Sequence, residues 1–153
     1  MDPLLSDAFN FLEQQQLGVI STISKDNTPE SACVNYLPDR DWGIFVLTSS
    51  ESRKVQNIKN NNHVSFVVGV AGIPNTVQIQ AEAEILDGND DFNSALQKFK
   101  DSGRLNRDPI YAIFGGNYVI LRLKITWLRW LYFEKDSGKE VYTVFTPEGK
   151  QES

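Results

Sequence analysis

The stretch 76–86 constrains the fold most strongly, because polar and apolar side chains alternate along its whole length. The apolar side chains at alternate positions are Val77, Ile79, Ala81, Ala83 and Ile85. Successive side chains of a β-strand point to opposite faces, so this pattern predicts a strand with one face in a core and the other in water. Such a long strand suits a sheet that bends into a barrel.

Other β-rich runs and amphipathic stretches surround this strand and indicate the fold class. The expected strands are 17–24, 30–37, 42–47, 63–70, 76–86, 118–133 and 141–145. The expected helices are 3–16, 52–61 and 90–100. Short turns join the first three strands, which predicts an antiparallel meander. The sequence therefore predicts a mainly β protein with flanking helices, a closed or nearly closed barrel of six to seven antiparallel strands.

Length and charge narrow the class of protein. The chain has 153 residues, which suits one domain over 1–153, with a mobile polar tail expected at 147–153. Its formal net charge of -5 argues against binding nucleic acid or a membrane surface, because both need clustered positive charge. No apolar run approaches the ~20 residues of a membrane span, and no basic region of a secretory signal precedes the first apolar residues. We expect a soluble, cytoplasmic protein.

Residues 48–62 carry the strongest indication of a ligand, because a hydroxyl-rich loop joins an expected strand to an expected helix. The first backbone N–H groups of a helix have no acceptor within the helix and favour an anion there. Ser50 or Ser52 can cap this helix, and Arg53 and Lys54 add positive charge. No glycine-rich phosphate loop is present, so a capped surface helix with solvated charges remains an equal alternative from this stretch alone.

Other chemistries have weaker support. His63 is the single histidine, and we expect it to be exposed or to cap a strand rather than to bind a metal. Cys33 is the single cysteine, so no intramolecular disulfide is possible, and its apolar strand predicts a packing role. A serine nucleophile in the hydroxyl-rich loop would need a positioned base, and none is visible. We therefore assign no metal ligand and no catalytic residue.

A resemblance adds to this interpretation. The run Thr48-x-x-x-Ser52-Arg53-Lys54, followed by a helix and by Val64-Ser65 on the next strand, resembles the FMN-binding split barrels typified by pyridoxamine 5′-phosphate oxidase. The order of helices and strands agrees along most of the chain. The resemblance implies a split β-barrel that forms a homodimer, with FMN in a groove at the subunit interface.

Carried over position by position, the resemblance implies two sets of cofactor-binding residues. The residues that would hold the FMN phosphate are Thr48, Ser49, Ser52, Arg53 and Lys54. The strand whose backbone would lie along the isoalloxazine edge contains Val34, Asn35 and Tyr36. Oxidases of this family also place a glutamine of a later strand on the flavin, and the matching position here is Thr76 or Gln78.

The substrate site departs from the family pattern. An arginine and a lysine in the second strand of the B6 oxidases correspond here to Ala32 and Leu37, and the Arg-x-His motif near their C-terminus is missing. The run Trp127-Leu-Arg129-Trp130 stands near that end instead. The resemblance therefore implies a superfamily member that is not a true B6 oxidase. We expect one of the two tryptophans in the core and the other beside the flavin or at a dimer seam, while Arg129 serves an interface, an anionic substrate or an ordinary surface.

Three functions stay open from the sequence. The leading hypothesis is an FMN-dependent oxidoreductase with a small-molecule substrate or reductant. The second is a flavin- or small-ligand-binding module without turnover, such as a stress or sensor protein. The third is a barrel interaction domain whose Ser-Arg-Lys helix is only surface. The deazaflavin F420 or haem could replace FMN, because a fold of this type hosts several ligands.

Overall fold

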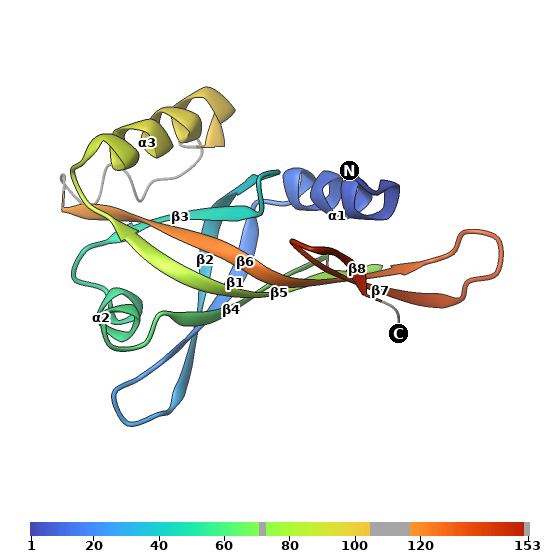
Figure 1. Cartoon of the computed structure of the whole chain (residues 1–153), viewed down its shortest axis with the longest axis horizontal. Helices are drawn as coiled ribbons and strands as arrows, with labels where there is room; N and C mark the ends of the chain where they lie inside the picture. Colours follow the sequence, from blue (N-terminus) through green and yellow to red (C-terminus); the bar gives the residue numbers. More distant parts are fainter. Residues whose placement is uncertain (71–72, 105–116, 152–153) are drawn as a thin grey trace.

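The structure, a computed structural model, describes residues 1–70, 73–104 and 117–151. Within these residues, three helices surround one sheet (Figure 1). The helices are α1 (Pro3–Gln14), α2 (Arg53–Asn60) and α3 (Asp90–Ser102). The strands are β1 (Leu17–Ile23), β2 (Pro29–Asp39), β3 (Gly43–Ser49), β4 (His63–Val70), β5 (Ile73–Leu86), β6 (Tyr118–Phe133), β7 (Glu140–Thr146) and β8 (Gly149–Gln151).

The strands pair antiparallel in the order β3-β2-β1-β4-β5-β6-β7-β8. β3 also pairs with β6, in a register that runs from Gly43–Lys124 to Ser49–Tyr118, and this contact closes the first six strands into a barrel. The β6–β7 hairpin projects away from the barrel (Figure 1). The predicted mainly β antiparallel barrel is confirmed. β8 is an addition, because Gly149–Gln151 pairs with β7 where the sequence predicts a mobile tail.

Two helices cover two apolar clusters. α1 begins after Asp2, whose carboxylate accepts a hydrogen bond from the Leu4 amide at 2.8 Å, and its fully buried Phe9 and Leu12 join the cluster inside the barrel. α3 begins after Asn89, whose side chain accepts from the Phe92 amide at 2.8 Å. Its apolar face packs on a second cluster formed on the outer face of β3. β3 is therefore buried on both faces, unlike β5, whose polar face remains exposed.

The long strands β5 and β6 carry the alternation that the sequence shows. Their register shifts between Gln80 and Ala81, so Thr126 has no direct partner on β5. Beyond this bulge Trp130 is buried against Phe11, with ring centroids 5.1 Å apart, while Trp127 is half-buried. The expectation of one core tryptophan is confirmed.

The prediction for Cys33 is wrong. The sequence predicts packing in an apolar strand, but the Cys33 side chain is exposed. The reason is the strand period: Val34 and Tyr36 face the core, which turns Cys33 outward. His63 is exposed as expected, and the Asn61 side chain accepts a hydrogen bond from its amide at 3.0 Å. The sequence also indicates a short segment from Pro109 to the Gly115-Gly116 pair, and this segment lies outside the described residues.

Tyr36 ties β2 to two neighbouring elements. Its fully buried side chain donates a hydrogen bond of 2.6 Å to the carbonyl of Leu12, at the end of α1. Burial raises the pKa of the Tyr36 phenol well above its usual value, which keeps the hydroxyl a donor. The Arg104 guanidinium donates to the carbonyl of Tyr36 at 2.6 Å and to that of Glu13 at 2.8 Å. β2 is thus fixed to α1 and to the end of α3.

We predict that Tyr36→Phe lowers the free energy of unfolding by about 1–3 kcal/mol, because the buried carbonyl of Leu12 loses its donor. Urea denaturation followed by circular dichroism measures this change. Tyr142→Phe is the matched control, since the Tyr142 side chain is 49% exposed, and we expect a change within about 0.5 kcal/mol. Equal stability of Tyr36→Phe and the wild type would contradict the anchoring role.

Candidate anion-binding site

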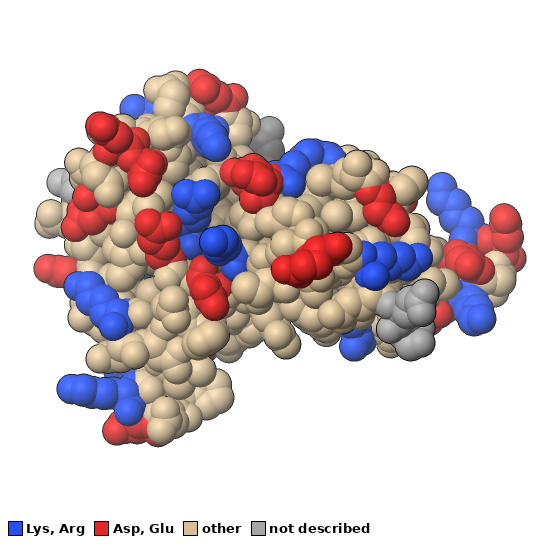
Figure 2. Space-filling model, in the orientation of Figure 1, with Lys and Arg blue, Asp and Glu red and all other residues tan. Residues whose placement is uncertain are grey.

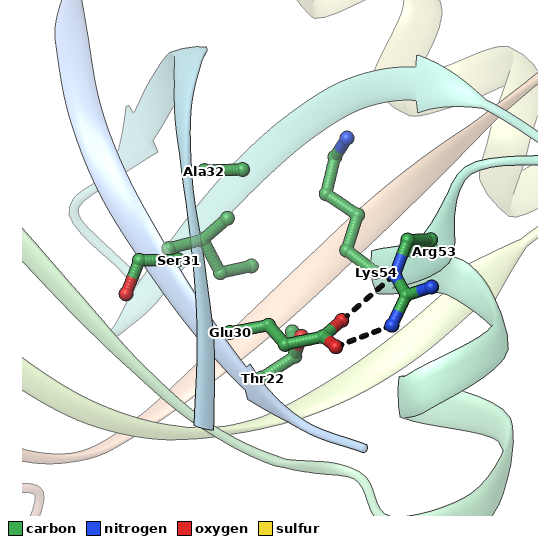
Figure 3. Close-up of a pocket in the computed structure, with 7 residues that line it drawn as sticks. Thr22, Glu30, Ser31, Ala32, Arg53 and Lys54 are labelled. Carbon is green, nitrogen blue, oxygen red and sulfur yellow. Dashed lines mark hydrogen bonds and ion pairs between the residues drawn. The ribbon is translucent and has the colours of Figure 1, made fainter. Parts of the chain in front are cut away.

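A pocket of about 320 Å³ lies between β1, β2 and the start of α2 (Figure 3). Its lining residues are Ile20, Thr22, Glu30, Ser31, Ala32, Arg53 and Lys54. Ile20 and Thr22 of β1 are buried on the inward face of the sheet. The pocket therefore lies on that side of the sheet rather than on its outer face. The start of α2 supplies both cations of the pocket.

The turn before α2 leaves one hydroxyl without a partner. The Ser52 amide donates to the Ser49 carbonyl at 3.2 Å, and the Gln56 amide donates to the Ser52 carbonyl at 3.2 Å, which starts the helix. Ser52 stands at the N-cap position, yet its side chain makes no capping bond. Less than 1 Å² of its Oγ is exposed, and this atom has no hydrogen-bond partner among the described residues. A buried hydroxyl of this kind is suited to a ligand oxygen.

Lys54 provides a positive charge inside the pocket. Its side chain is half-buried and extends away from the pair formed by Glu30 and Arg53, alongside Ala32 (Figure 3). None of the ion pairs found among the described residues includes Lys54. Burial lowers the pKa of its ammonium, because the charged form loses hydration. An anion bound in the pocket would stabilise the charged ammonium and so raise its pKa again.

Arg53 has a carboxylate partner that the sequence did not reveal. Its Nε donates to Oε1 of Glu30 at 3.1 Å, and its Nη2 donates to Oε2 at 2.5 Å. The Asn57 amide group donates to Glu30 at 3.0 Å and to the Thr22 hydroxyl at 2.9 Å. Asn57 and Thr22 are buried, whereas the Arg53 side chain is 81% exposed. A chain of polar contacts therefore runs from the interior out to Arg53 and fixes its guanidinium.

The same contacts change the acidity of Glu30. The hydrogen bonds from Arg53 and then from Asn57 lower the pKa of its carboxyl from 4.5 to about 2. Glu30 is therefore ionised at every pH at which the protein would work. The sequence carries one indication of this role for Glu30. Glu30 is an even number of residues from the core residues Val34 and Tyr36, so its acidic side chain lies on the inward face of the strand.

The expected cofactor-binding residues fall on two faces of the sheet. Ser52, Arg53 and Lys54 lie together at the start of α2. Ser49 is the last residue of β3, and its Oγ accepts a hydrogen bond from the Glu51 amide at 3.3 Å. Thr48 is buried at the end of β3. Among the residues of β2, Val34 and Tyr36 have buried side chains that face the core.

The remaining three expected residues belong to the outer face. Gln78 is exposed, and its strand neighbours Val77 and Ile79 point inward. Thr76 shares the face of Gln78, and Asn35 alternates with two inward neighbours on β2. Within one chain, the structure therefore does not bring these three side chains to the pocket beside Lys54.

Arg129 and Trp127 lie on the same outer face as Gln78. Arg129 is the cross-strand partner of Gln78, and its guanidinium lies 4.2 Å from the centroid of the Tyr142 ring. Trp127 and Tyr142 also line a wider cleft of about 770 Å³ beside β7 and β8. Figure 2 shows that positive and negative side chains are interspersed on the face it presents, without one continuous patch of either sign.

Comparison with protein families identifies the chain. The family model described as pyridoxamine 5'-phosphate oxidase matches residues 6–130. The chain belongs to this family. The match runs from within α1 to Trp130 of β6, and so includes the pocket at α2. A search of the curated proteins found no significant match.

Solved structures show the same fold at low sequence identity. General Stress Protein 26 from Bacillus anthracis str. Sterne is 21% identical, with 90% of this chain and 97% of that chain covered and a TM-score of 0.65. A pyridoxamine 5'-phosphate oxidase-related, FMN-binding protein from Nostoc punctiforme is 9% identical, with coverages of 96% and 98% and a TM-score of 0.63. A heme-binding protein from Mycobacterium smegmatis is 17% identical, with coverages of 97% and 60% and a TM-score of 0.72.

The helices of the structure bear on the expectation that no segment spans a membrane. None of α1, α2 and α3, the helices of the described residues, is long and apolar enough to cross a membrane.

We predict that Glu30 contributes to stability in a pH-dependent way. A folded-state pKa of about 2, below the usual 4.5, means that the contribution is complete above pH 4.5 and is lost as the pH falls towards 2. Denaturation midpoints of the wild type and Glu30→Gln, measured between pH 2.5 and 7, should therefore differ most above pH 4.5 and converge in acid. A difference that stays constant over this range would contradict the ion pair.

Proposed function

We propose that the protein binds a flavin mononucleotide whose phosphate lies in the pocket at the start of α2. The observation that carries this proposal is the pairing of two unsatisfied groups at that point: the buried Ser52 Oγ without a partner and the half-buried Lys54 without an ion pair, both within the described residues. A phosphate satisfies both groups at once, since it offers acceptor oxygens and negative charge. The family and the FMN-binding protein from Nostoc punctiforme support the choice of ligand.

The residues present fit a phosphate in charge and in position. Ser52 Oγ and the first amides of α2 would donate hydrogen bonds to its oxygens. Lys54 would supply a charge inside the pocket, and Arg53 would add the guanidinium hydrogens that Glu30 leaves unused on Nη1 and Nη2. Thr48 and Ser49 end the strand that leads into this turn and would complete the set.

A bound flavin would supply hydride or electron transfer, so the proposed activity is that of an FMN-dependent oxidoreductase. The chain would contribute the position of the cofactor and the electrostatics around it. A flavin-binding protein without turnover is the second candidate. One of the similar folds is named a general stress protein, so a stress-related role belongs with this candidate. Haem is the alternative ligand that a similar structure supports, through the heme-binding protein from Mycobacterium smegmatis.

We include a homodimer in the proposal, because one chain does not gather the expected residues. Asn35, Thr76 and Gln78 lie on the outer face, away from the pocket beside Lys54. A second copy of the chain, packed on that face, would place these three side chains beside the flavin that the second copy binds. One row of cross-strand partners crosses this face from β2 to β6: Cys33, Val19, Val67, Gln78 and Arg129. Arg129, at the end of the row, is its one charged residue. An uncharged surface of this kind suits burial.

We predict that the protein takes up FMN, and that Lys54→Ala weakens this binding by about 10- to 100-fold, because a charge-assisted contact to the phosphate is lost. Quenching of flavin fluorescence measures the affinity, and the visible spectrum of the complex confirms the ligand. Lys59→Ala, at the exposed end of α2, is the matched control and should bind as the wild type does. A protein that binds no FMN, or a Lys54→Ala variant with unchanged affinity, would contradict the proposed site.

The two candidate activities separate in one measurement on the FMN complex. An oxidoreductase should show bleaching of the flavin absorbance when NADH or NADPH is added without oxygen. A flavin that stays oxidised with both reductants, and is reduced only by dithionite, would favour the binding module.

We predict that Val67→Lys converts a dimer to a monomer, because the new charge would be buried at the centre of the outer row. Light scattering coupled to size-exclusion chromatography measures the mass. Ser94→Lys introduces the same charge on the exposed side of α3 and should leave the mass unchanged. A wild-type monomer, or a Val67→Lys dimer, would contradict this interface.

A further inference from the structure

We propose that Arg129 binds the carboxylate of a small planar ligand, beside the cleft that Trp127 and Tyr142 line. This site lies on the outer face of the sheet, whereas the phosphate pocket lies on the inward side. The inference goes beyond the proposed function, which leaves the class of the small molecule open.

The charges along β6 show that Arg129 lacks a partner that the other cations of the strand have. Side chains of opposite charge that stand directly across an antiparallel pair stabilise each other. The two other cations of β6 each stand opposite a glutamate of β5, in the pairs Arg122–Glu84 and Lys124–Glu82. Arg129 stands opposite the neutral Gln78. β5 therefore supplies a carboxylate to every cation of β6 except this one.

The other residues around Arg129 do not supply a carboxylate either. Its cross-strand partner on β7 is Val144, and the next residues on the same face of β6 are Trp127 and Leu131. No ion pair in the described part of the chain includes Arg129, and its Nε has no hydrogen-bond partner there. Its positive charge is thus uncompensated within one chain.

The surroundings of the Arg129 guanidinium strengthen its attraction for an anion. The group lies 4.2 Å from the centroid of the Tyr142 ring, and less than 1 Å² of its Nε is exposed. Partial burial displaces water, so the remaining charge is screened less than that of a fully exposed arginine. The side chain is only half-buried, so a ligand can reach its exposed part from solvent. A guanidinium is planar and offers several parallel donors, which matches the geometry of a carboxylate.

The adjacent cleft indicates the shape of the ligand. Its volume of about 770 Å³ falls within the range of small-molecule sites, about 300–1,000 Å³. Trp127, Tyr132 and Tyr142 contribute aromatic side chains to its lining, and aromatic rings favour a planar ligand that packs against them. Lys150 adds a second positive charge to the lining, which includes no acidic residue. A planar molecule with a carboxylate fits this combination.

The homodimer proposed above would give this ligand a role. Gln78 would then lie beside the flavin of the second copy, and Arg129 is the cross-strand partner of Gln78. A planar carboxylate at Arg129 is then the candidate substrate. This role rests on the proposed function, whereas the carboxylate site itself does not.

The experiment measures the binding of 4-nitrobenzoate and of the neutral 4-nitrobenzamide to the full chain by isothermal titration calorimetry. The two probes differ in one group, so the ratio of their dissociation constants isolates the contribution of the carboxylate. For the wild type we expect 4-nitrobenzoate to bind at least about 10-fold more tightly, because it gains a charge-assisted contact. Arg129→Gln should lose this preference.

Two further variants sharpen the comparison. Gln78→Glu keeps Arg129 and gives it the cross-strand carboxylate that the other cations of β6 have, so it should also remove the preference. This variant decides the question even if Arg129→Gln does not fold. Arg122→Gln removes an exposed cation of the same strand, and it should prefer 4-nitrobenzoate as the wild type does.

Several outcomes would overturn the carboxylate site. They are a wild type that binds neither probe or both equally, and a preference that survives in Arg129→Gln or in Gln78→Glu. A preference that Arg122→Gln also loses would show a general effect of surface charge and would overturn the site as well. If the wild type shows no preference and Arg129→Gln breaks a wild-type dimer in light scattering, a carboxylate of the second copy occupies Arg129 instead.

A separate titration of the wild type with FMN distinguishes this inference from the proposed function. A protein that prefers 4-nitrobenzoate but binds no FMN would contradict the proposed function and leave the carboxylate site standing. A protein that binds FMN but shows no preference between the two probes would overturn the carboxylate site alone.

Discussion

The pairing of β3 with β6 is the contact on which the rest of the structure depends. It closes the barrel, and because it continues to Ser49–Tyr118 it also fixes the point where β3 ends and the turn into α2 begins. The Ser50 amide donates to the carbonyl of Asn117, just before β6, at 3.2 Å, which extends the same contact into the turn. The start of α2 is thereby held over the inward face of β1 and β2. The pocket is a consequence of barrel closure.

Buried polar side chains lie beside the apolar core at the pocket. Thr22 and Asn57 are buried, and the Asn57 amide group donates a hydrogen bond to the Thr22 hydroxyl and another to Glu30. A buried amide with two acceptors in place is costly to disturb, so the carboxylate that holds Arg53 has a rigid support. Ser52 and Lys54, in contrast, are left without comparable partners among the described residues. The difference separates the groups that build the pocket from those that would meet a ligand.

Local patterns in the sequence predicted most of the fold. Alternation over 76–86 and 118–133 predicted β5 and β6, and helical spacing predicted α1, α2 and α3, because these patterns record which face of an element is buried. β8 escaped prediction, since Gly149–Gln151 has no apolar face and its pairing depends on the position of β7. The prediction for Cys33 is wrong because apolar neighbours do not by themselves bury a strand residue, and the alternation along β2 turns the Cys33 side chain outward.

The candidate site was predictable only in part, for a related reason. Arg53 and Lys54 follow a local motif, so the sequence could place them at a helix start. The contact between Arg53 and Glu30 joins residues that are far apart in the chain and depends on how β2 lies against α2. The sequence could not separate the roles of two adjacent cations, one paired on the surface and one half-buried in the pocket.

A crystal structure of the protein with bound FMN tests the central claim most directly. We expect the phosphate at the start of α2, with its oxygens within hydrogen-bond distance of Ser52 Oγ and Lys54 Nζ and with the pair of Arg53 and Glu30 intact. A phosphate bound elsewhere, with Ser52 and Lys54 still lacking ligand contacts, would contradict it.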